Sequence, residues 1–340
     1  MWLGFGPLQY LGLFLEGLQH GCSVKRNVVS NAKNIEYKTS SLRRIHPTGL
    51  SMRSAIKRKK IHEQQLAVGL LLSLCLSSVS AQEFSQNDDP EFQRVAPFQV
   101  FDNLYYVGAK WVSAWLLETD QGLILFDTLY GELTDLVVDG IRDLGFDPND
   151  IRYVVVSHAH YDHIGGAKRM QDEFGAVVLM TEEDWAMVEE EPVYQAYPKP
   201  MRHLMVTDNG TVNLGRTGLR FVKTPGHTTG VASTRFTVYD DGFPFQAFMF
   251  GGVGLNFEGV ERTQMYIASV KRLQQMGDIE VNIPNHAASG DVFERYKLLK
   301  ERQEGQPHPF IDPEGYTVWL DELLIAAEAK LIEEKAAARH

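Results

Sequence analysis

The chain has 340 residues, of which 44% are hydrophobic and 23% are charged, so it is long enough to bury a substantial core in one or two domains. Its formal net charge is −11, but residues 1–81 are basic, and the remainder carries 22 basic against 41 acidic residues. Such an acidic body argues against nucleic acid or an anionic membrane as a partner.

An export signal is predicted ahead of this acidic body. Met52–Lys60 is strongly basic, and Leu66–Leu76 is apolar but too short to span a bilayer comfortably. Val79-Ser80-Ala81 then supplies small residues for cleavage. We therefore predict a signal peptide over residues 52–81 and a periplasmic or secreted protein. An uncleaved membrane anchor is the alternative.

Residues 1–51 show no pattern typical of a fold, and we interpret them as an unstructured, non-native extension upstream of a start at Met52. Both cysteines, Cys22 and Cys75, precede the predicted cleavage point. The mature chain, residues 82–340, would therefore contain no disulfide and no thiolate ligand, and its length suits one large domain.

Apolar patterns and turn residues predict a mixed α/β order in this domain. The predicted strands are Phe98–Phe101, Leu104–Val107, Val112–Leu117, Leu123–Asp127, the apolar run Val154-Val155-Val156, Ala176–Met180, Leu219–Lys223, Ala232–Tyr239, Phe245–Gly251 and Ile279–Pro284. The predicted helices are Thr134–Leu144, Gly166–Phe174, Thr263–Met276 and a C-terminal helix that begins at Asp312-Pro313. A long irregular stretch is expected after Met180. Two sheets packed face to face, with helices outside, would bury these elements.

The stretch His158-Ala159-His160-Tyr161-Asp162-His163 directly follows the buried run Val154-Val155-Val156. In extended backbone, His158 and His160 would point the same way. One divalent metal could bind these two histidines, and a second could bind Asp162 and His163. Imidazole with one carboxylate suits zinc, and iron and manganese are the alternative metals for such a site. A solvated surface cluster is disfavoured, because a buried strand leads into these polar groups.

Two further histidines each end a predicted strand. His227 follows Thr224-Pro225-Gly226, whose proline and glycine predict a tight turn, and His286 follows Asn285. His203, His308 and His340 lack such a context and are predicted to lie on the surface.

Together, His158-x-His160-x-Asp162-His163, Thr224-Pro225-Gly226-His227 and His286 resemble the metallo-β-lactamase superfamily over most of Phe98–His286. The resemblance implies an α/β fold of the four-layer αββα sandwich type, with two zinc ions at one edge between the sheets. His158, His160 and His227 would hold the first ion, and Asp162, His163 and His286 the second. Asp127 would support the site from behind, unless it simply forms a turn.

Many members of the superfamily have a bridging aspartate after the strand that ends near Gly251, but Gly252-Val253-Gly254 carries none. This resembles the β-lactamase subclass whose two metal sites use only histidine and aspartate. That subclass generally has hydroxyl side chains where Gly252 and Gly254 stand. The resemblance therefore leaves a β-lactam and a lactone or other ester open as substrates.

The implied reaction is hydrolysis of a small molecule with a carbonyl group. Two zinc ions would lower the pKa of a shared water toward about 7, and the resulting hydroxide would open a cyclic amide. Asp162 would orient that hydroxide, and no protein nucleophile is needed. Aromatic residues that could line the cleft are Trp111, Trp115, Trp185 and Tyr194.

A second class of function is an iron oxidoreductase resembling a persulfide dioxygenase or a diiron flavoprotein. Diiron members usually place glutamate where His160 stands and add a bridging carboxylate, and this sequence has neither. A non-catalytic binding module is disfavoured, because all six expected ligands are present.

Overall fold

Two β-sheets lie at the centre of the domain in the computed structural model, which describes residues 86–190 and 197–339. The seven-stranded sheet has the order β1-β2-β3-β4-β5-β6-β7, and the five-stranded sheet has the order β12-β11-β10-β9-β8. In chain order the strands are β1 (Phe98–Phe101), β2 (Leu104–Tyr106), β3 (Trp115–Thr119), β4 (Gly122–Phe126), β5 (Ile151–Val155), β6 (Val177–Thr181), β7 (Leu204–Val206), β8 (Thr211–Leu214), β9 (Thr217–Lys223), β10 (Ala232–Asp240), β11 (Phe243–Met249) and β12 (Val281–Asn282).

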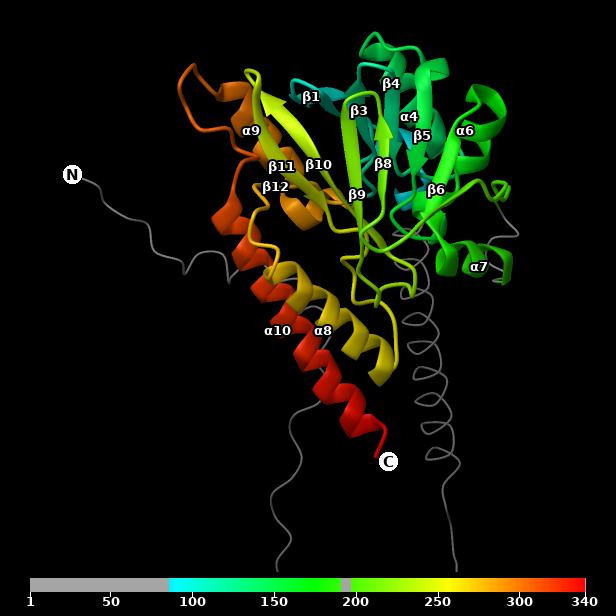
Figure 1. The fold of residues 1–340 in the computed structure, drawn as a ribbon, viewed down its shortest axis with the longest axis vertical. Helices are drawn as coiled ribbons and strands as arrows, with labels where there is room; N and C mark the ends of the chain where they lie inside the picture. Colours follow the sequence, from blue (N-terminus) through cyan, green and yellow to red (C-terminus); the bar gives the residue numbers. More distant parts are fainter. Residues whose placement is uncertain (1–85, 191–196, 340) are drawn as a thin grey trace, which may run out of the picture. The chain divides into compact units, whose positions relative to one another are not determined.

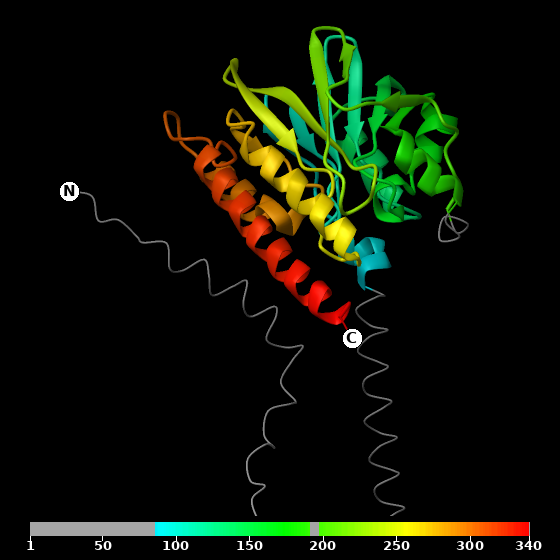
Figure 2. The ribbon, with the colours of Figure 1, turned by 60° about the horizontal axis from the view of Figure 1, so that its bottom comes forward.

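Helices cover the outer face of each sheet, which confirms the predicted four-layer α/β fold. In chain order they are α3 (Pro90–Gln93), α4 (Leu133–Asp143), α5 (Tyr161–Ile164), α6 (Ala167–Phe174), α7 (Glu182–Glu190), α8 (Val260–Gln274), α9 (Val292–Glu301) and α10 (Pro313–Ala337). Helices α4 and α6 lie beside the seven-stranded sheet, whereas α8 and α10 lie side by side against the five-stranded sheet (Figures 1 and 2).

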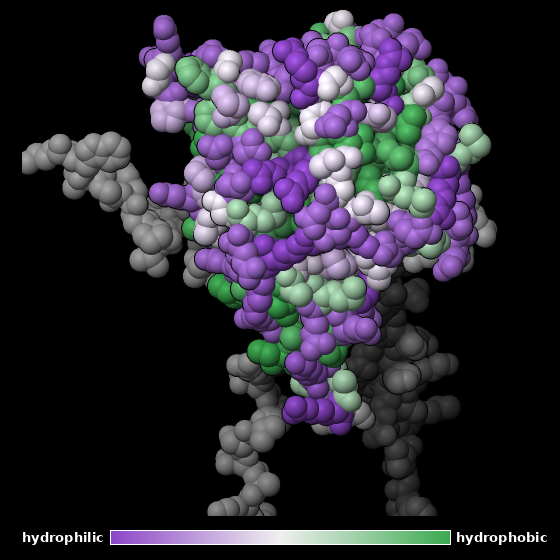
Figure 3. Space-filling view, in the orientation of Figure 1, coloured by the Kyte–Doolittle hydropathy of each residue, from purple (hydrophilic) through white to green (hydrophobic). Residues whose placement is uncertain are grey.

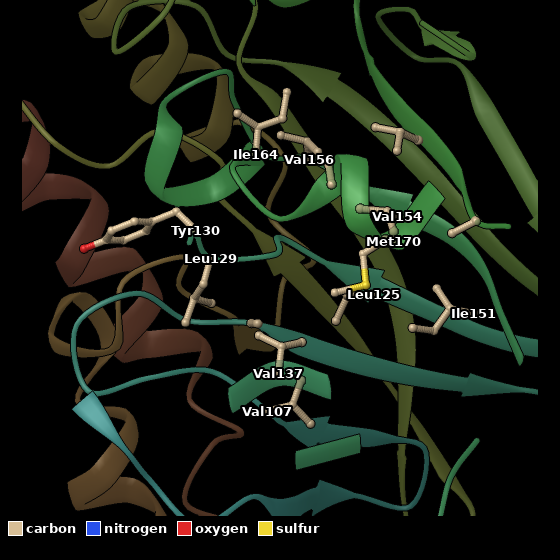
Figure 4. Packing of buried hydrophobic residues seen from close by; sticks show 14 of the residues in the cluster. Val107, Leu125, Leu129, Tyr130, Val137, Ile151, Val154, Val156, Ile164 and Met170 are labelled. Atoms are coloured by element: carbon tan, nitrogen blue, oxygen red, sulfur yellow. The ribbon is translucent and has the colours of Figure 1, made fainter. Parts of the chain in front are cut away.

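Strand β4 shows how the layers are held together. Leu123 and Leu125 pack toward α4 and α6, while Ile124 and Phe126 pack between the sheets, where the Phe126 ring stacks on Phe236 at 4.9 Å. Alternate side chains point to opposite faces, and both faces are covered, so this strand is apolar throughout. Figure 4 shows Leu125 among the residues of β5, α4 and α6 that form the helix-facing core.

Most predicted elements are confirmed, with shifted ends. The stretch expected to be irregular contains α7, and the prediction also missed β7, β8, α9 and the one-turn helices α3 and α5. Thr181 and Asp184 stand at the spacing of a helix-capping pair, and the Asp184 N–H lies 3.4 Å from Thr181 Oγ1. Three acidic residues in the first turn also favour a helix start, since they face the positive end of the helix dipole.

The prediction that His308 lies on the surface is wrong. His308 is buried, its Nε2 donates to the Val100 carbonyl at 2.9 Å, and its ring stacks on Phe101 at 4.2 Å. Its Nδ1 accepts from the Phe310 N–H, so both ring nitrogens are satisfied. His308 is therefore a core residue that ties the segment before α10 to β1. His203 is exposed, as predicted, and His340 lies outside the described residues.

Two of the aromatic residues predicted to line the cleft belong to the core instead. Trp115 is fully buried and donates through Nε1 to the Pro284 carbonyl at 2.9 Å, and Trp185 is 1% exposed. A large ring gains more from burial in a closed core than from an open wall, and β3 and α7 place both rings there. Tyr194 lies outside the described residues.

The predicted extension (residues 1–51) and signal peptide (residues 52–81) also lie outside the described residues. Within the described part, no helix combines the length and the apolar character needed to cross a membrane. The face of the domain in Figure 3 is largely hydrophilic, with smaller hydrophobic patches between the polar side chains.

Candidate metal centre

The segment that carries the first histidines leaves the seven-stranded sheet at the end of β5. The strand ends at Val155, and residues 157–160 form bends outside it, although His160 itself has the expected extended backbone (φ −75°, ψ 147°). The tight path is followed by the one-turn helix α5, for which His160 is the N-cap. This bent segment brings the two imidazoles together, with His158 Nε2 and His160 Nδ1 3.0 Å apart.

His227 completes a first group of three histidines. Its Nε2 lies 3.1 Å from His158 Nε2. The other nitrogen of each of these two rings, Nδ1, donates to a backbone carbonyl at 2.7 Å, His158 to Gly251 and His227 to Gly254. A carbonyl only accepts, so both Nδ1 atoms carry the proton and both Nε2 atoms present bare lone pairs.

Asp162, His163 and His286 form a second group beside the first. His163 Nε2 lies 3.2 Å from His286 Nε2 and 3.4 Å from Asp162 Oδ2. The rings of His158 and His163 are 4.2 Å apart between their centroids, so the two groups adjoin. The structure thus brings together all six residues that the sequence singled out, from the one-turn helix α5 and from loops that follow strands of both sheets.

Asp127 lies behind the second group and is fully buried. Its Oδ2 accepts from His163 Nδ1 at 2.7 Å and from the Ser157 hydroxyl at 2.8 Å, and its Oδ1 accepts from the Ser157 N–H at 2.7 Å. This fixes the His163 ring so that its Nε2 faces Asp162 and His286. Asp127 therefore supports the site from behind, and its role exceeds that of a turn residue.

The two groups differ in their electrostatics. Burial lowers the pKa of His158, His160 and His227, to about 4 for His160 and about 3 for His227, so the first group is neutral at pH 7. Burial would also lower the pKa of His163, but the carboxylates of Asp162 and Asp127 outweigh it and raise that pKa to about 10.

Both groups fit a metal ion. Two unprotonated nitrogens that face each other at 3.1 Å repel, unless a cation lies between them. Tetrahedral ligands about 2.0–2.1 Å from a zinc ion stand about 3.3 Å apart, close to the nitrogen separations in both groups. Each residue offers one ligand atom, and within each group these atoms lie within 4.8 Å of one another.

A cavity of about 600 Å³ opens over the two groups. His160, His227, Asp162 and His286 face it, so both groups can be reached by one ligand. The other residues along its wall are Trp111, Tyr161, Val253, Gly254, Asn256, Asn285 and Ser289. Of the four aromatic residues predicted for this wall, Trp111 does line it, and its ring lies 5.5 Å from that of His286.

Helix α8 holds the turn that carries His227. This role of the helix was not predicted from the sequence. Arg262 donates through Nε to the Gly226 carbonyl at 3.1 Å and through Nη2 to the His227 carbonyl. Ser269 donates to the Pro225 carbonyl at 2.8 Å. These donors stand seven residues apart along the helix, on one face. That spacing alone could not reveal their role, because their acceptors lie on a distant turn.

Asp184 was also missed, since it lies on the unpredicted helix α7. Its Oδ2 accepts from the Ala159 N–H at 2.9 Å and from the Thr228 hydroxyl at 3.1 Å, and its Oδ1 accepts from the Gly230 N–H at 3.1 Å. Asp184 thereby joins the backbone between His158 and His160 to the loop after His227. Burial raises its pKa to about 6, against these hydrogen bonds, which lower it.

Comparison with known proteins agrees with this geometry. The sequence pattern of the Metallo-beta-lactamase superfamily matches residues 108–241, and the chain carries a domain of this superfamily. BJP-1, a subclass B3 metallo-beta-lactamase of Bradyrhizobium japonicum, has 28% sequence identity and a TM-score of 0.67, covering 72% of this chain and 97% of that one. The FEZ-1 metallo-beta-lactamase from Legionella gormanii has 26% identity and a TM-score of 0.66, covering 72% of this chain and 98% of that one.

A curated relative has a different printed activity. N-acyl homoserine lactonase AiiA of Bacillus thuringiensis subsp. kurstaki is 24% identical over 194 residues, which are 48% of this chain and 76% of the lactonase. The structural likeness to subclass B3 enzymes thus stands beside a sequence likeness to a lactonase.

Proposed function

We propose that this protein is a metal-dependent hydrolase with two zinc ions, which opens a cyclic amide in the manner of a β-lactamase. The observation that carries the proposal is the pair of adjoining ligand groups at one cavity, built from five histidines and one aspartate. Imidazole nitrogens with a single carboxylate favour zinc among the common divalent metals. When bound, the two ions supply an activated water and polarise the substrate carbonyl.

The chain's own residues orient the reacting groups. Asp162 lines the cavity, and His163 and His286 outweigh the effect of burial and hold the pKa of its carboxyl below the usual range. The ionised carboxylate can therefore accept a hydrogen from the attacking water and orient its oxygen toward the carbonyl carbon. The water oxygen bonds to that carbon, the ring C–N bond breaks, and the released proton passes to the leaving nitrogen.

The test is a substrate panel with the purified, zinc-loaded protein. We expect about two zinc ions per chain by mass spectrometry, hydrolysis of nitrocefin or a carbapenem, and loss of activity with a chelator. Zinc-loaded protein that hydrolyses neither β-lactams nor lactones would contradict the proposal. Iron in the purified protein together with oxygen consumption would instead favour an oxidoreductase.

The second candidate is a lactonase or another ester hydrolase on the same scaffold, which the similarity to AiiA favours. The same two ligand groups would polarise an ester carbonyl in place of an amide. N-acyl homoserine lactones in the panel separate the candidates. Turnover of lactones without turnover of any β-lactam would replace the first candidate by the second.

Export of the protein is a further part of the proposal, supported by the basic and apolar stretches before Ala81. Expression of the full chain in a bacterial host should yield a soluble periplasmic or secreted protein whose N-terminus is Gln82. A protein that keeps Met52 and stays in the membrane fraction would indicate the uncleaved anchor.

A further inference from the structure

Close packing against His227 explains why glycine stands at positions 252 and 254. A methyl group added at Gly252 would lie 2.8 Å from the Cβ of His227 and 2.7 Å from Val231. One added at Gly254 would lie 3.2 Å from Cε1 of the His227 ring. A hydroxyl side chain at position 252 would therefore push against His227, and one at position 254 would meet Asn256 Oδ1 at 2.5 Å. Residues 251–259 themselves carry no hydroxyl, so a hydroxyl that anchors the substrate has to come from another segment.

Ser289 lies in the short 3-10 helix Ala287–Gly290 that follows β12, three residues beyond His286, and lines the cavity. Its N–H donates to the His286 carbonyl at 3.0 Å, so its backbone is tied to the second group. The Ser289 hydroxyl makes no hydrogen bond within the part of the chain that the structure describes, although it is partly exposed to the cavity. It thus presents a free donor beside His286.

No lysine or arginine is among the described residues that line the cavity. Three other polar groups on the wall are less suited to bind a substrate near the second group. The side-chain amide of Asn285 already donates to the Gly251 carbonyl at 3.0 Å. Tyr161 is fixed by ring contacts with Tyr130 and Tyr197, at 5.0 Å and 5.6 Å between centroids. The exposed Asn256 adjoins Gly254, on the side of the first group. The Ser289 hydroxyl is therefore the hydrogen-bond donor available to an anionic substituent of the substrate beside the second group.

We propose that Ser289 is a specificity-determining residue, whose hydroxyl donates a hydrogen bond to a carboxylate carried on the substrate ring next to the scissile bond. The inference rests on the proposed hydrolase function and names its substrate class, a ring that bears a carboxylate, in preference to a neutral lactam or lactone. Trp111, whose ring lies 5.5 Å from that of His286, flanks the same end of the cavity.

The test compares benzylpenicillin with its methyl ester, which differ only at this carboxylate. A hydrogen bond to a charged group contributes enough that Ser289→Ala should raise KM for the acid about tenfold and change kcat little. The KM for the ester should rise by less than about twofold, since it lacks the charged acceptor. Ser289→Thr keeps the hydroxyl and should restore most of the preference for the acid.

A matched control moves the hydroxyl by one residue. Ala288 is exposed and does not line the cavity, so Ala288→Ser combined with Ser289→Ala should not restore the preference. Calorimetry gives a readout that does not depend on turnover. The ring-opened penicillin product, which keeps the carboxylate, should bind the zinc-loaded Ser289→Ala variant about tenfold more weakly than the unchanged protein.

Equal increases in KM for acid and ester in Ser289→Ala would overturn the inference, because Ser289 would then only shape the loop. Unchanged KM values together with unchanged product binding would overturn it as well. If the unchanged protein hydrolyses lactones alone, the β-lactamase proposal fails separately. The inference is then decided by a pair of lactones with and without a ring carboxylate, of which the carboxylate-bearing one should lose more in Ser289→Ala.

Discussion

The two ligand groups adjoin each other but are held in place in different ways. In the first group, backbone carbonyls of Gly251 and Gly254 orient His158 and His227, and all three imidazoles are neutral. In the second group, the buried carboxylate of Asp127 orients His163, and Asp162 adds a second negative charge. Neutral groups need shape and hydrogen bonds, whereas buried charges also need partners of opposite sign.

This difference predicts that the first group depends mainly on backbone geometry and the second mainly on charge. A cation in the second group would offset two buried carboxylates, so binding there should respond strongly to pH and to the loss of one carboxylate. Binding in the first group should respond to changes in α8 and in the loop after β11.

The largest effect is expected from direct loss of a ligand in the second group. Asp162→Ala should remove one metal ion and reduce kcat more than about a hundredfold, beyond the range typical of residues that only support ligands. Metal analysis should give one ion per chain and circular dichroism an unchanged fold. His286→Ala should behave alike, and full activity of either variant would contradict the assignment.

Asp127→Asn tests the support of His163 alone. Asparagine keeps the shape and tolerates the positive φ of 59° at this position, but its amide has only one accepting oxygen. It therefore cannot accept from the Ser157 N–H on one side and from His163 and the Ser157 hydroxyl on the other, as the carboxylate does. We expect metal affinity in the second group to fall about 10–100-fold, and affinity in the first group to change little. Equal losses of metal affinity in both groups, measured by competition with a chelator, would show that the two groups are not independent.

The pH dependence of metal binding should separate the groups as well. Without metal, His163 has a pKa raised to about 10, so binding must displace its proton, and affinity should fall about tenfold for each pH unit below that value. The first group should bind with nearly constant affinity between about pH 6 and 9, because burial keeps its imidazoles neutral there. Calorimetry in buffers of different ionisation enthalpy measures the protons released.

The raised pKa of His163 also affects the stability of the metal-free protein. A higher pH favours metal binding but lowers this stability. The folded state holds this proton more tightly than the unfolded state, whose histidine pKa is about 6.5. The contribution to stability is therefore complete below about pH 6.5 and is lost as the pH rises through about 10. Thermal unfolding of metal-free Asp127→Asn should show a weaker loss over this range.

The smallest effect is expected from Arg262→Lys on α8. A guanidinium donates to the Gly226 and His227 carbonyls together, whereas one ammonium reaches fewer acceptors in this geometry. Affinity in the first group should fall about tenfold, in the lower part of the range for groups that orient ligands, and affinity in the second should stay constant. Arg272→Lys is the matched control, because Arg272 donates to the Lys223 carbonyl, farther from the ligand.

Much of the site could be predicted because its signals are local. His158, His160, Asp162 and His163 follow one apolar strand, and Asp312-Pro313 does start α10, with the Asp312 side chain accepting from Gly315 N–H. Such patterns report the backbone within a few residues. Helix α7 has a local signal too, in Thr181 and Asp184, but the proline-rich sequence after it was interpreted as irregular.

The sequence by itself determined the α/β class, the order of most strands and the residues that form the two ligand groups, because strand periodicity and ligand spacing are properties of neighbouring residues. Only the tertiary structure decided that His308 is buried, that Asp184 and Arg262 hold the ligand loops, and that Ser289 lines the cavity. The physical reason is that these roles depend on hydrogen bonds and packing between segments far apart in the chain, whose distances no local pattern encodes.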